Sequence, residues 1–269
     1  MTLKFRPVGG LLSELTLLRI EIAEGILHVR LTRPSKRNAI NDALIAQINS
    51  TFRHLPPEAL AVVISGDGDH FCAGLDLSEV SHRGVADAIH QSRAWHAAFD
   101  QVQFGRAPVI AVLHGAVVGG GLELASAAQL RVAEESAFYG LPEAQRGIFV
   151  GGGGSARITR LIGVSRMTDM MLTGRVFDAL EGQVVGLSNY LVGKGEGLAK
   201  AFELAQKIAG NTPLSNFSIT QALPRIADLP QGEGLFMEAL MSAVAQGDEA
   251  AKTRVQAFLD KRAMKVIKP

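Results

Sequence analysis

The sequence predicts an α/β protein with a largely parallel sheet and a helical C-terminal region. Short apolar runs alternate with segments of helical spacing through the first part of the chain, as repeated βα units require. From about residue 155 onward the pattern is almost wholly helical. Because 269 residues exceed the usual size of one domain, we expect a core at 1–195 and an appended region at 196–269.

The first elements are expected to be a hairpin, a helix and a buried strand. "LTLLRIEI" and "ILHVRLT" alternate as strands do, and a short turn with Gly25 separates them. Asn41 is the expected N-cap of a helix with one apolar face. "ALAVVISG" is a continuous apolar run, which is typical of a strand buried on both sides.

The later elements repeat this alternation before the pattern becomes helical. Helical spacing at 85–104 precedes the apolar strand "VIAVL", the helix "GGGLELASAAQ" and the strands "LRVA" and "AFYG". Pro213 can open a helix at its first turn, and 232–246 and 248–263 are expected to be the last two helices.

The composition argues against several classes of protein. With 47% hydrophobic and 20% charged residues, the chain fits a compact globular protein. Lys and Arg total 27 against 26 for Asp and Glu, so no net field attracts nucleic acid. A single cysteine, Cys72, suits a reducing compartment, and with no targeting signal visible we expect a cytoplasmic protein.

The apolar stretch 109–128 has the length of a membrane span and carries Gly115 and Gly119 in GxxxG spacing. His114 and Glu123 argue against that interpretation, since a carboxylate at membrane depth costs on the order of 2.5 kcal/mol or more. A buried strand that leads into a helix is the favoured interpretation.

Three loops hold the residues best suited to chemistry: "GDGDHFCAGLDLSEV" at 66–80, "HGAVVGGGLE" at 114–123 and "LPEAQRGIFVGGGGS" at 141–155. Each follows or closes an apolar strand. In a parallel sheet the ligand lies outside the carboxyl ends of the strands, so we expect the loops to converge there.

Glu123 and Glu143 are the candidate acid and base. The glycines at 119–121 let backbone approach a ligand at the start of a helix, where free amides favour negative charge. A fixed Glu123 would repel a resident phosphate, so a transient oxyanion beside a working carboxylate fits better. Glu143 can divide acid and base work with it. Alternatively, each is a solvated Glu that interacts weakly with a helix dipole.

Other motifs have weaker support. The GxGxxA match at 151–156 does not clearly follow a strand, as dinucleotide binding would require. Cys72 is either a nucleophile or, as free cysteines usually are, a small buried hydrophobe. The histidines lack metal-binding spacing, and Ser126 and Ser155 lack a GxSxG elbow.

These loops, together with "RPSKRNAI" at 33–40, resemble the crotonase, or enoyl-CoA hydratase/isomerase, superfamily from about residue 15 to the C-terminus. "RPSKRNAI" is similar to its CoA-side loop, "FCAGLDL" to its first oxyanion loop and "GAVVGGGLEL" to its second, in the usual order. The resemblance implies a spiral of ββα units with a C-terminal helical region that builds homotrimers, commonly paired into hexamers.

The resemblance also implies an enoyl-CoA hydratase. The backbone amides of Ala73 and Gly120 would form an oxyanion hole for the thioester carbonyl of an acyl-CoA. Glu123 would activate or orient the water that attacks Cβ, and Glu143 would exchange a proton with Cα. Family isomerases typically keep only the second acid, so the pair favours hydration. Coenzyme A enters as part of the substrate, with no separate cofactor or metal expected.

The resemblance further implies a set of CoA contacts. Two cations and nearby backbone would hold the CoA, with adenine against the loop at 74–77, and "FLDKR" matches a pattern that reaches the nucleotide end, often from a neighbouring subunit. The expected contacts are Lys36, Arg37, Ala39, Leu75, Asp76, Leu77, Phe258 and Lys261.

The sequence departs from the family at two places. His114 stands where Asn is common, with a structural role expected for either. "RGIFVGGGGSARI" replaces a "GAGGT"-like run, so Phe149 and Val150 are expected to reshape the acyl pocket. The remaining alternatives are an isomerase, thioester hydrolase, decarboxylase or methylthioacryloyl-CoA hydratase of the same fold, or a non-catalytic acyl-CoA-binding or RNA-binding relative.

Overall fold

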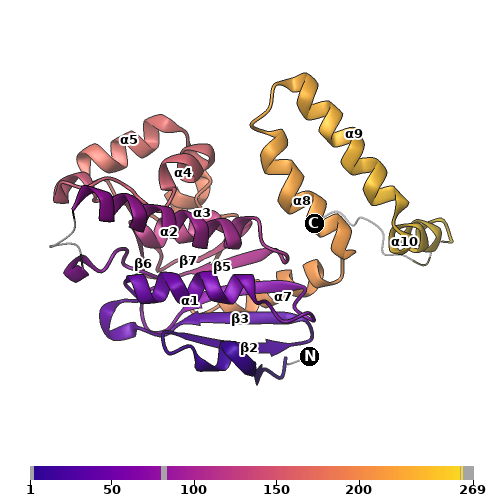
Figure 1. Ribbon diagram of the computed structural model, residues 1–269, viewed down its shortest axis with the longest axis horizontal. Helices are drawn as coiled ribbons and strands as arrows, with labels where there is room; N and C mark the ends of the chain where they lie inside the picture. The colour runs from indigo at the N-terminus through magenta and orange to yellow at the C-terminus, as the bar shows by residue number, and fades with distance from the viewer. Residues whose placement is uncertain (1–2, 80–83, 261, 263–269) are drawn as a thin grey trace. The chain divides into compact units, whose positions relative to one another are not determined.

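The computed structural model describes residues 3–79, 84–260 and 262 (Figure 1). The chain divides into two compact units, Met1–Ile208 and Ala209–Pro269. Helix α7 (Gly197–Ala209) packs against the main sheet through Ala201, Leu204 and Ala205. The first unit therefore extends through this helix, beyond the boundary expected after residue 195.

The main sheet has seven strands in the order β1-β2-β3-β4-β5-β7-β10. The first three are antiparallel, as the expected hairpin requires, and every pairing from β3 onward is parallel. The strands are β1 (Arg6–Pro7), β2 (Leu18–Ala23), β3 (Ile26–Leu31), β4 (Ala61–Gly66), β5 (Val109–Leu113), β7 (Leu130–Glu134) and β10 (Tyr190–Val192).

Both sides of the central strands are buried, which confirms the interpretation of "ALAVVISG". Because successive side chains of a strand point to opposite faces, Val62 and Ile64 join one hydrophobic core and Val63 the other. Helix α7 covers the face with Val63. Helices α1 (Asp42–Arg53) and α2 (Val85–Gln103) contribute apolar side chains to the other core, and they run beside each other in Figure 1.

A small second sheet lies beside the loops of interest. It joins β6 (Ala116–Val118), β8 (Phe138–Gly140) and β9 (Phe177–Asp178). The sequence analysis did not predict β6, which occupies only three residues between an apolar strand and the glycines. An isolated bridge from Cys72 to Val117 ties the loop at 66–80 to this strand.

Cys72 is fully buried, and burial raises the pKa of its thiol to about 12. The thiolate that a nucleophile requires therefore does not form near neutral pH. Of the two interpretations of Cys72, the structure supports the buried hydrophobe.

The remaining helices surround the loops or form the second unit. Within the described residues, no helix is long and apolar enough to cross a membrane, and the stretch at 109–128 forms β5, β6 and α3 instead. Pro213 opens α8 at its first position, as expected. The helices are α3 (Gly120–Ala127), α4 (Gly154–Ile162), α5 (Val164–Thr173) and α6 (Ala179–Val185), then α8 (Pro213–Ile226), α9 (Gln231–Gly247) and α10 (Glu249–Leu259).

Candidate active site

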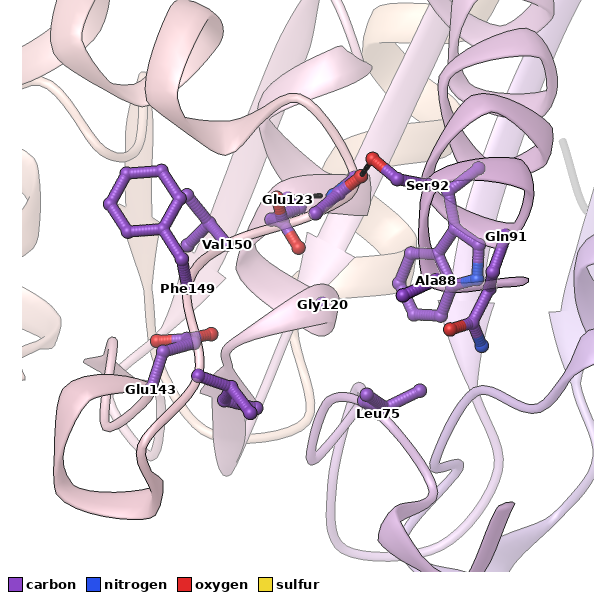
Figure 2. A pocket seen from close by; sticks show the side chains of 13 residues that line it. Leu75, Ala88, Gln91, Ser92, Gly120, Glu123, Glu143, Phe149 and Val150 are labelled. Atoms are coloured by element: carbon purple, nitrogen blue, oxygen red, sulfur yellow. Dashed lines mark hydrogen bonds between the residues drawn. The ribbon is translucent and has the colours of Figure 1, made fainter. Parts of the chain in front are cut away.

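The three loops singled out in the sequence meet at one cavity of about 300 Å³. Figure 2 shows Glu143, Phe149 and Val150 on one wall, the side chains of α2 on the opposite wall, and Glu123 and Gly120 between them. The lining residues are Leu75, Ala88, Gln91, Ser92, Trp95, Gly120, Glu123, Glu143, Ile148, Phe149, Val150, Gly151 and Gly152.

The glycine run before α3 is required by close contacts. Gly119 has a φ of +53°, and a Cβ there would lie 2.8 Å from Oε1 of Glu143. A Cβ at Gly120 would lie 2.6 Å from Cζ3 of Trp95. Side chains at these positions would block the approach of α3 to the loop at 141–146 and to α2.

A short backbone ladder fixes the first oxyanion loop. The amide of Ala73 donates to the carbonyl of Arg37 at 3.0 Å. Ile40 then binds on both sides of Leu75: its amide donates to the Gly74 carbonyl at 2.7 Å, and its carbonyl accepts from the Asp76 amide at 2.8 Å. Among the described residues, no acceptor pairs with the Leu75 amide.

The ladder therefore leaves the amide of Leu75, and not the expected amide of Ala73, available to a ligand. The Ala73 amide is already used within the loop. The Leu75 nitrogen lies 3.5 Å from where a Cβ of Gly120 would stand, so it is next to the start of α3. Gly120 is the first residue of that helix, and its amide has no intrahelical partner. Two amides that have no partner among the described residues thus lie together at the cavity.

Glu123 is held at the cavity by the glycine run at 151–154. The residue is 3% exposed, and its Oε1 accepts hydrogen bonds from the amides of Gly152 and Gly154, each at 2.8 Å. Burial raises the pKa of Glu123, while those amides lower it. A Cβ at Gly154 would lie 2.9 Å from Cγ of Glu123, so this approach requires glycine.

Glu143 sits in a different environment. It caps a 3-10 turn at Ala144–Arg146, and its buried Oε2 has no hydrogen-bond partner in the described part of the chain. Burial, supported by the negative charge of Glu123, raises the pKa of Glu143 to about 7, although a backbone hydrogen bond opposes the shift. Near neutral pH this carboxyl can therefore carry a proton.

The residues expected to shape the acyl pocket do line the cavity. Val150 is 8% exposed and Phe149 is 68% exposed. Trp95 on α2, which the sequence analysis did not single out, adds an aromatic wall at the same cavity. Its role could not be seen from the sequence because it depends on how α2 packs against Gly120 and Gly152.

Hydrogen bonds connect only some of the residues that were expected to contact CoA. Lys36 and Arg37 are exposed at a turn, and Arg37 has a φ of +50°. Arg33, which the sequence analysis did not single out, donates to the carbonyl of Ala39 and pairs with Asp76 at 3.0 Å. Hydrogen bonds from Ser78 and then Arg33 lower the pKa of Asp76.

Leu77 lies in the same loop as Asp76, and a small adjoining hollow of about 90 Å³ reaches from it to Glu143. Phe258 is 62% exposed on α10 in the second unit. Lys261 lies outside the described residues. His114 bonds through Nε2 to the carbonyl of Gly68 at 3.0 Å, in keeping with the structural role expected of it.

This fold, with two unpaired amides and two buried carboxylates at one cavity, defines an enzyme of the crotonase class. The chain belongs to the enoyl-CoA hydratase/isomerase family, whose model matches residues 21–266. The match covers most of the chain and both units.

Individual relatives agree with this assignment. A probable mitochondrial enoyl-CoA hydratase 2 of Arabidopsis thaliana is 33% identical, over 88% of this chain and 80% of that protein. The 2,3-dehydroadipyl-CoA hydratase of Escherichia coli is 32% identical, over 93% and 97%. A crystal structure of a presumed enoyl-CoA hydratase from Rhodopseudomonas palustris is 54% identical, with a TM-score of 0.89 over 91% of this chain and 95% of that one.

Proposed function

We propose that this protein is an enoyl-CoA hydratase, which adds water across the α,β double bond of an enoyl-CoA thioester. The observation that carries the proposal is the pair of buried carboxylates, Glu123 and Glu143, at one cavity with two unpaired backbone amides. Relatives named as hydratases support the same reaction type.

In the proposed complex the thioester oxygen accepts hydrogen bonds from the amides of Leu75 and Gly120. These donors stabilise the negative charge that develops on that oxygen when the nucleophile adds to Cβ. Removal of one such donor in other enzymes costs about 2.7 to 4 kcal/mol of transition-state stabilisation. This is the largest single contribution that we assign to the site.

Glu123 acts as the base and Glu143 as the acid. With Oε1 of Glu123 held by two amides, Oε2 is the oxygen left to take a proton from water. The water oxygen bonds to Cβ, the π electrons move toward Cα and the thioester oxygen, and Glu143 delivers its proton to Cα. Glu123 then returns its proton to solvent, and Glu143 regains one.

The CoA moiety is proposed to contact the exposed cations Lys36 and Arg37, with Ala39 backbone beside them and adenine against the loop at 74–77. Phe258 and Lys261 are proposed to reach the nucleotide end from a neighbouring subunit of a homotrimer or hexamer. Charges at such a rim steer and position the substrate rather than take part in chemistry.

The test is a spectrophotometric assay with crotonyl-CoA and a panel of longer and branched enoyl-CoAs. Hydration removes the absorbance of the conjugated thioester without releasing thiol, whereas thioester hydrolysis releases free CoA thiol. Isomerisation moves the double bond and leaves the product unhydrated. Loss of conjugation with formation of a 3-hydroxyacyl-CoA supports the proposal. Thiol release as the main reaction would contradict it.

A further inference from the structure

The glycine run at 151–154, which binds Glu123, is held in place by two side chains other than Glu123 and Glu143. Ser92 on α2 donates from its hydroxyl to the carbonyl of Gly151 at 2.7 Å, a contact that Figure 2 marks with a dashed line. Arg157 on α4 donates from Nη1 to the carbonyl of Gly152 at 3.0 Å. Ser92 therefore fixes the Gly151–Gly152 peptide, whose amide serves Glu123, and Arg157 fixes the next peptide, which lies between the two amides that bind Glu123.

Arg157 is in turn fixed by two contacts to α2. Its Nε donates to Oε1 of Gln103 at 2.6 Å, and its Nη2 pairs with Oδ1 of Asp100 at 2.5 Å. The Arg157 side chain is 9% exposed, so the guanidinium has little freedom to choose other partners. A planar group with donors in several directions suits this arrangement, and a lysine ammonium does not reproduce it.

The guanidinium also packs directly on the glycine run. A Cβ at Gly153 would lie within van der Waals overlap of Nη1 of Arg157, at 2.3 Å, and Gly153 has a φ of +94°. With this φ, position 153 strongly favours glycine. Arg157 and the loop therefore form one packed unit rather than a chance surface contact.

The contact between Arg157 and the glycine run also places a positive charge near Glu123. The positive charge of Arg157 acts with the loop amides to lower the pKa of Glu123 against burial. Glu143 is the other acid that faces Glu123. Around Arg157, Asp100 supplies the paired negative charge, and Arg160 is a nearby cation. Beside this network lies His96, whose pKa burial lowers, with further lowering by Arg93 and Arg157.

We propose that Arg157 is a positioning residue for the water-activating carboxylate, since it fixes the peptide between the Gly152 and Gly154 amides that bind Glu123 and places a buried positive charge beside the ionised group. This inference rests on the proposed function, because it assigns Glu123 the role of base. Arg157 itself touches neither substrate nor water in this scheme and acts through its charge and through the Gly152–Gly153 peptide.

The test compares Arg157→Gln and Arg157→Lys with Arg166→Gln as a matched control. Arg166 on α5 bonds to the carbonyl of Ile162 in its own neighbourhood, away from the glycine run. The pH dependence of kcat/KM and kcat at saturation is measured for each with crotonyl-CoA. Thermal unfolding is followed in parallel, and Gln103→Leu serves as a milder variant if Arg157→Gln does not fold.

In Arg157→Gln we expect kcat to fall about tenfold or more, as small misplacements of catalytic groups do, with a smaller change in KM. The acidic limb of the profile should move to higher pH, because Glu123 then needs a higher pH to ionise. In Arg157→Lys the acidic limb should stay close to its original pH while kcat still falls, because lysine keeps the positive charge but lacks the planar group with several donors. Gln103→Leu should move the limb in the same direction by less, and Arg166→Gln should match the unaltered protein.

Two results would overturn the inference: an acidic limb that stays in place in Arg157→Gln or, where that variant does not fold, in Gln103→Leu; or an equal shift in Arg166→Gln. A loss of kcat with an unmoved limb assigns Arg157 a purely structural part. If the unaltered protein does not hydrate crotonyl-CoA or any other enoyl-CoA of the panel, the proposed function fails first, and that outcome is separate from both.

Discussion

Glu123 and Glu143 face one cavity and both are buried, yet the chain around them supplies the two carboxyls with different hydrogen-bond donors. Glu123 lies on a helix, and one of its oxygens receives two backbone amides. Glu143 lies at a 3-10 turn with a buried oxygen that no described group meets. This difference supports the proposed roles, a base at Glu123, where two amides bind one oxygen, and an acid at Glu143, where one buried oxygen lacks a donor.

The largest effect is expected when the base is removed. Glu123→Gln should lower kcat by roughly a hundredfold or more, the scale of lost general base help. The amide oxygen of Gln can still accept from Gly152 and Gly154, so the fold should persist, as circular dichroism can check. A near-normal rate of crotonyl-CoA hydration would remove Glu123 from the reaction and with it the contrast.

The acid should show itself in the pH profile. Because the pKa of Glu143 is about 7, its proton is lost as pH rises through that value, and hydration should fall on the alkaline side. Glu143→Gln should reduce kcat by about a hundredfold. The residual rate should lack the alkaline limb. An unchanged limb in this variant would assign the titration to another group.

The same contrast predicts a difference in stability. Glu143 has a raised pKa in the folded state, so its destabilising effect appears as pH rises from about 4.5 to about 7 and then levels off. At pH 8, Glu143→Gln should therefore raise the free energy of unfolding, on the order of 1 to 3 kcal/mol. Burial raises the pKa of Glu123 as well, but backbone amides partly oppose the rise, so Glu123→Gln should gain less. Urea unfolding at pH 4.5 and pH 8 measures both, and equal gains at the two pH values would contradict this account.

The smallest effect is expected at Phe149, on the wall of the cavity that also carries Glu143. Phe149 lies between Glu143 and the glycine run and remains largely exposed. Phe149→Ala should change KM among acyl chain lengths by a few-fold, on the order of 1 kcal/mol, and leave kcat for crotonyl-CoA nearly unchanged. Phe138→Ala, on β8 and away from the cavity lining, is the control. A large loss of kcat would show that Phe149 also positions Glu123 or Glu143.

Period-two and helical spacing allowed the sheet, its buried strands and the site loops to be predicted from the sequence. The hairpin before residue 31 and the helix capped by Asn41 are examples: the Asn41 side chain accepts from the Leu44 amide at 3.0 Å. These patterns depend on neighbours in the chain, which is why sequence alone reveals them.

What the sequence could not supply depends on pairings between distant segments. The amide left without a partner is that of Leu75 and not that of Ala73 because of the register between 37–40 and 73–76, which no local pattern encodes. Arg33 pairs with Asp76, which is 43 residues away, and Arg157 pairs with Asp100, which is 57 residues away. The boundary after α7 depends on which face of the sheet that helix covers.

The hydrogen bonds of Ile40 to the residues on both sides of Leu75 have a consequence for the affinity for acyl-CoA ligands. A donor already set by peptide pairing loses no conformational freedom when a ligand arrives, so association carries a smaller entropic penalty. Saturated acyl-CoAs, which offer the same carbonyl but no reactive alkene, should therefore occupy this groove as competitive inhibitors.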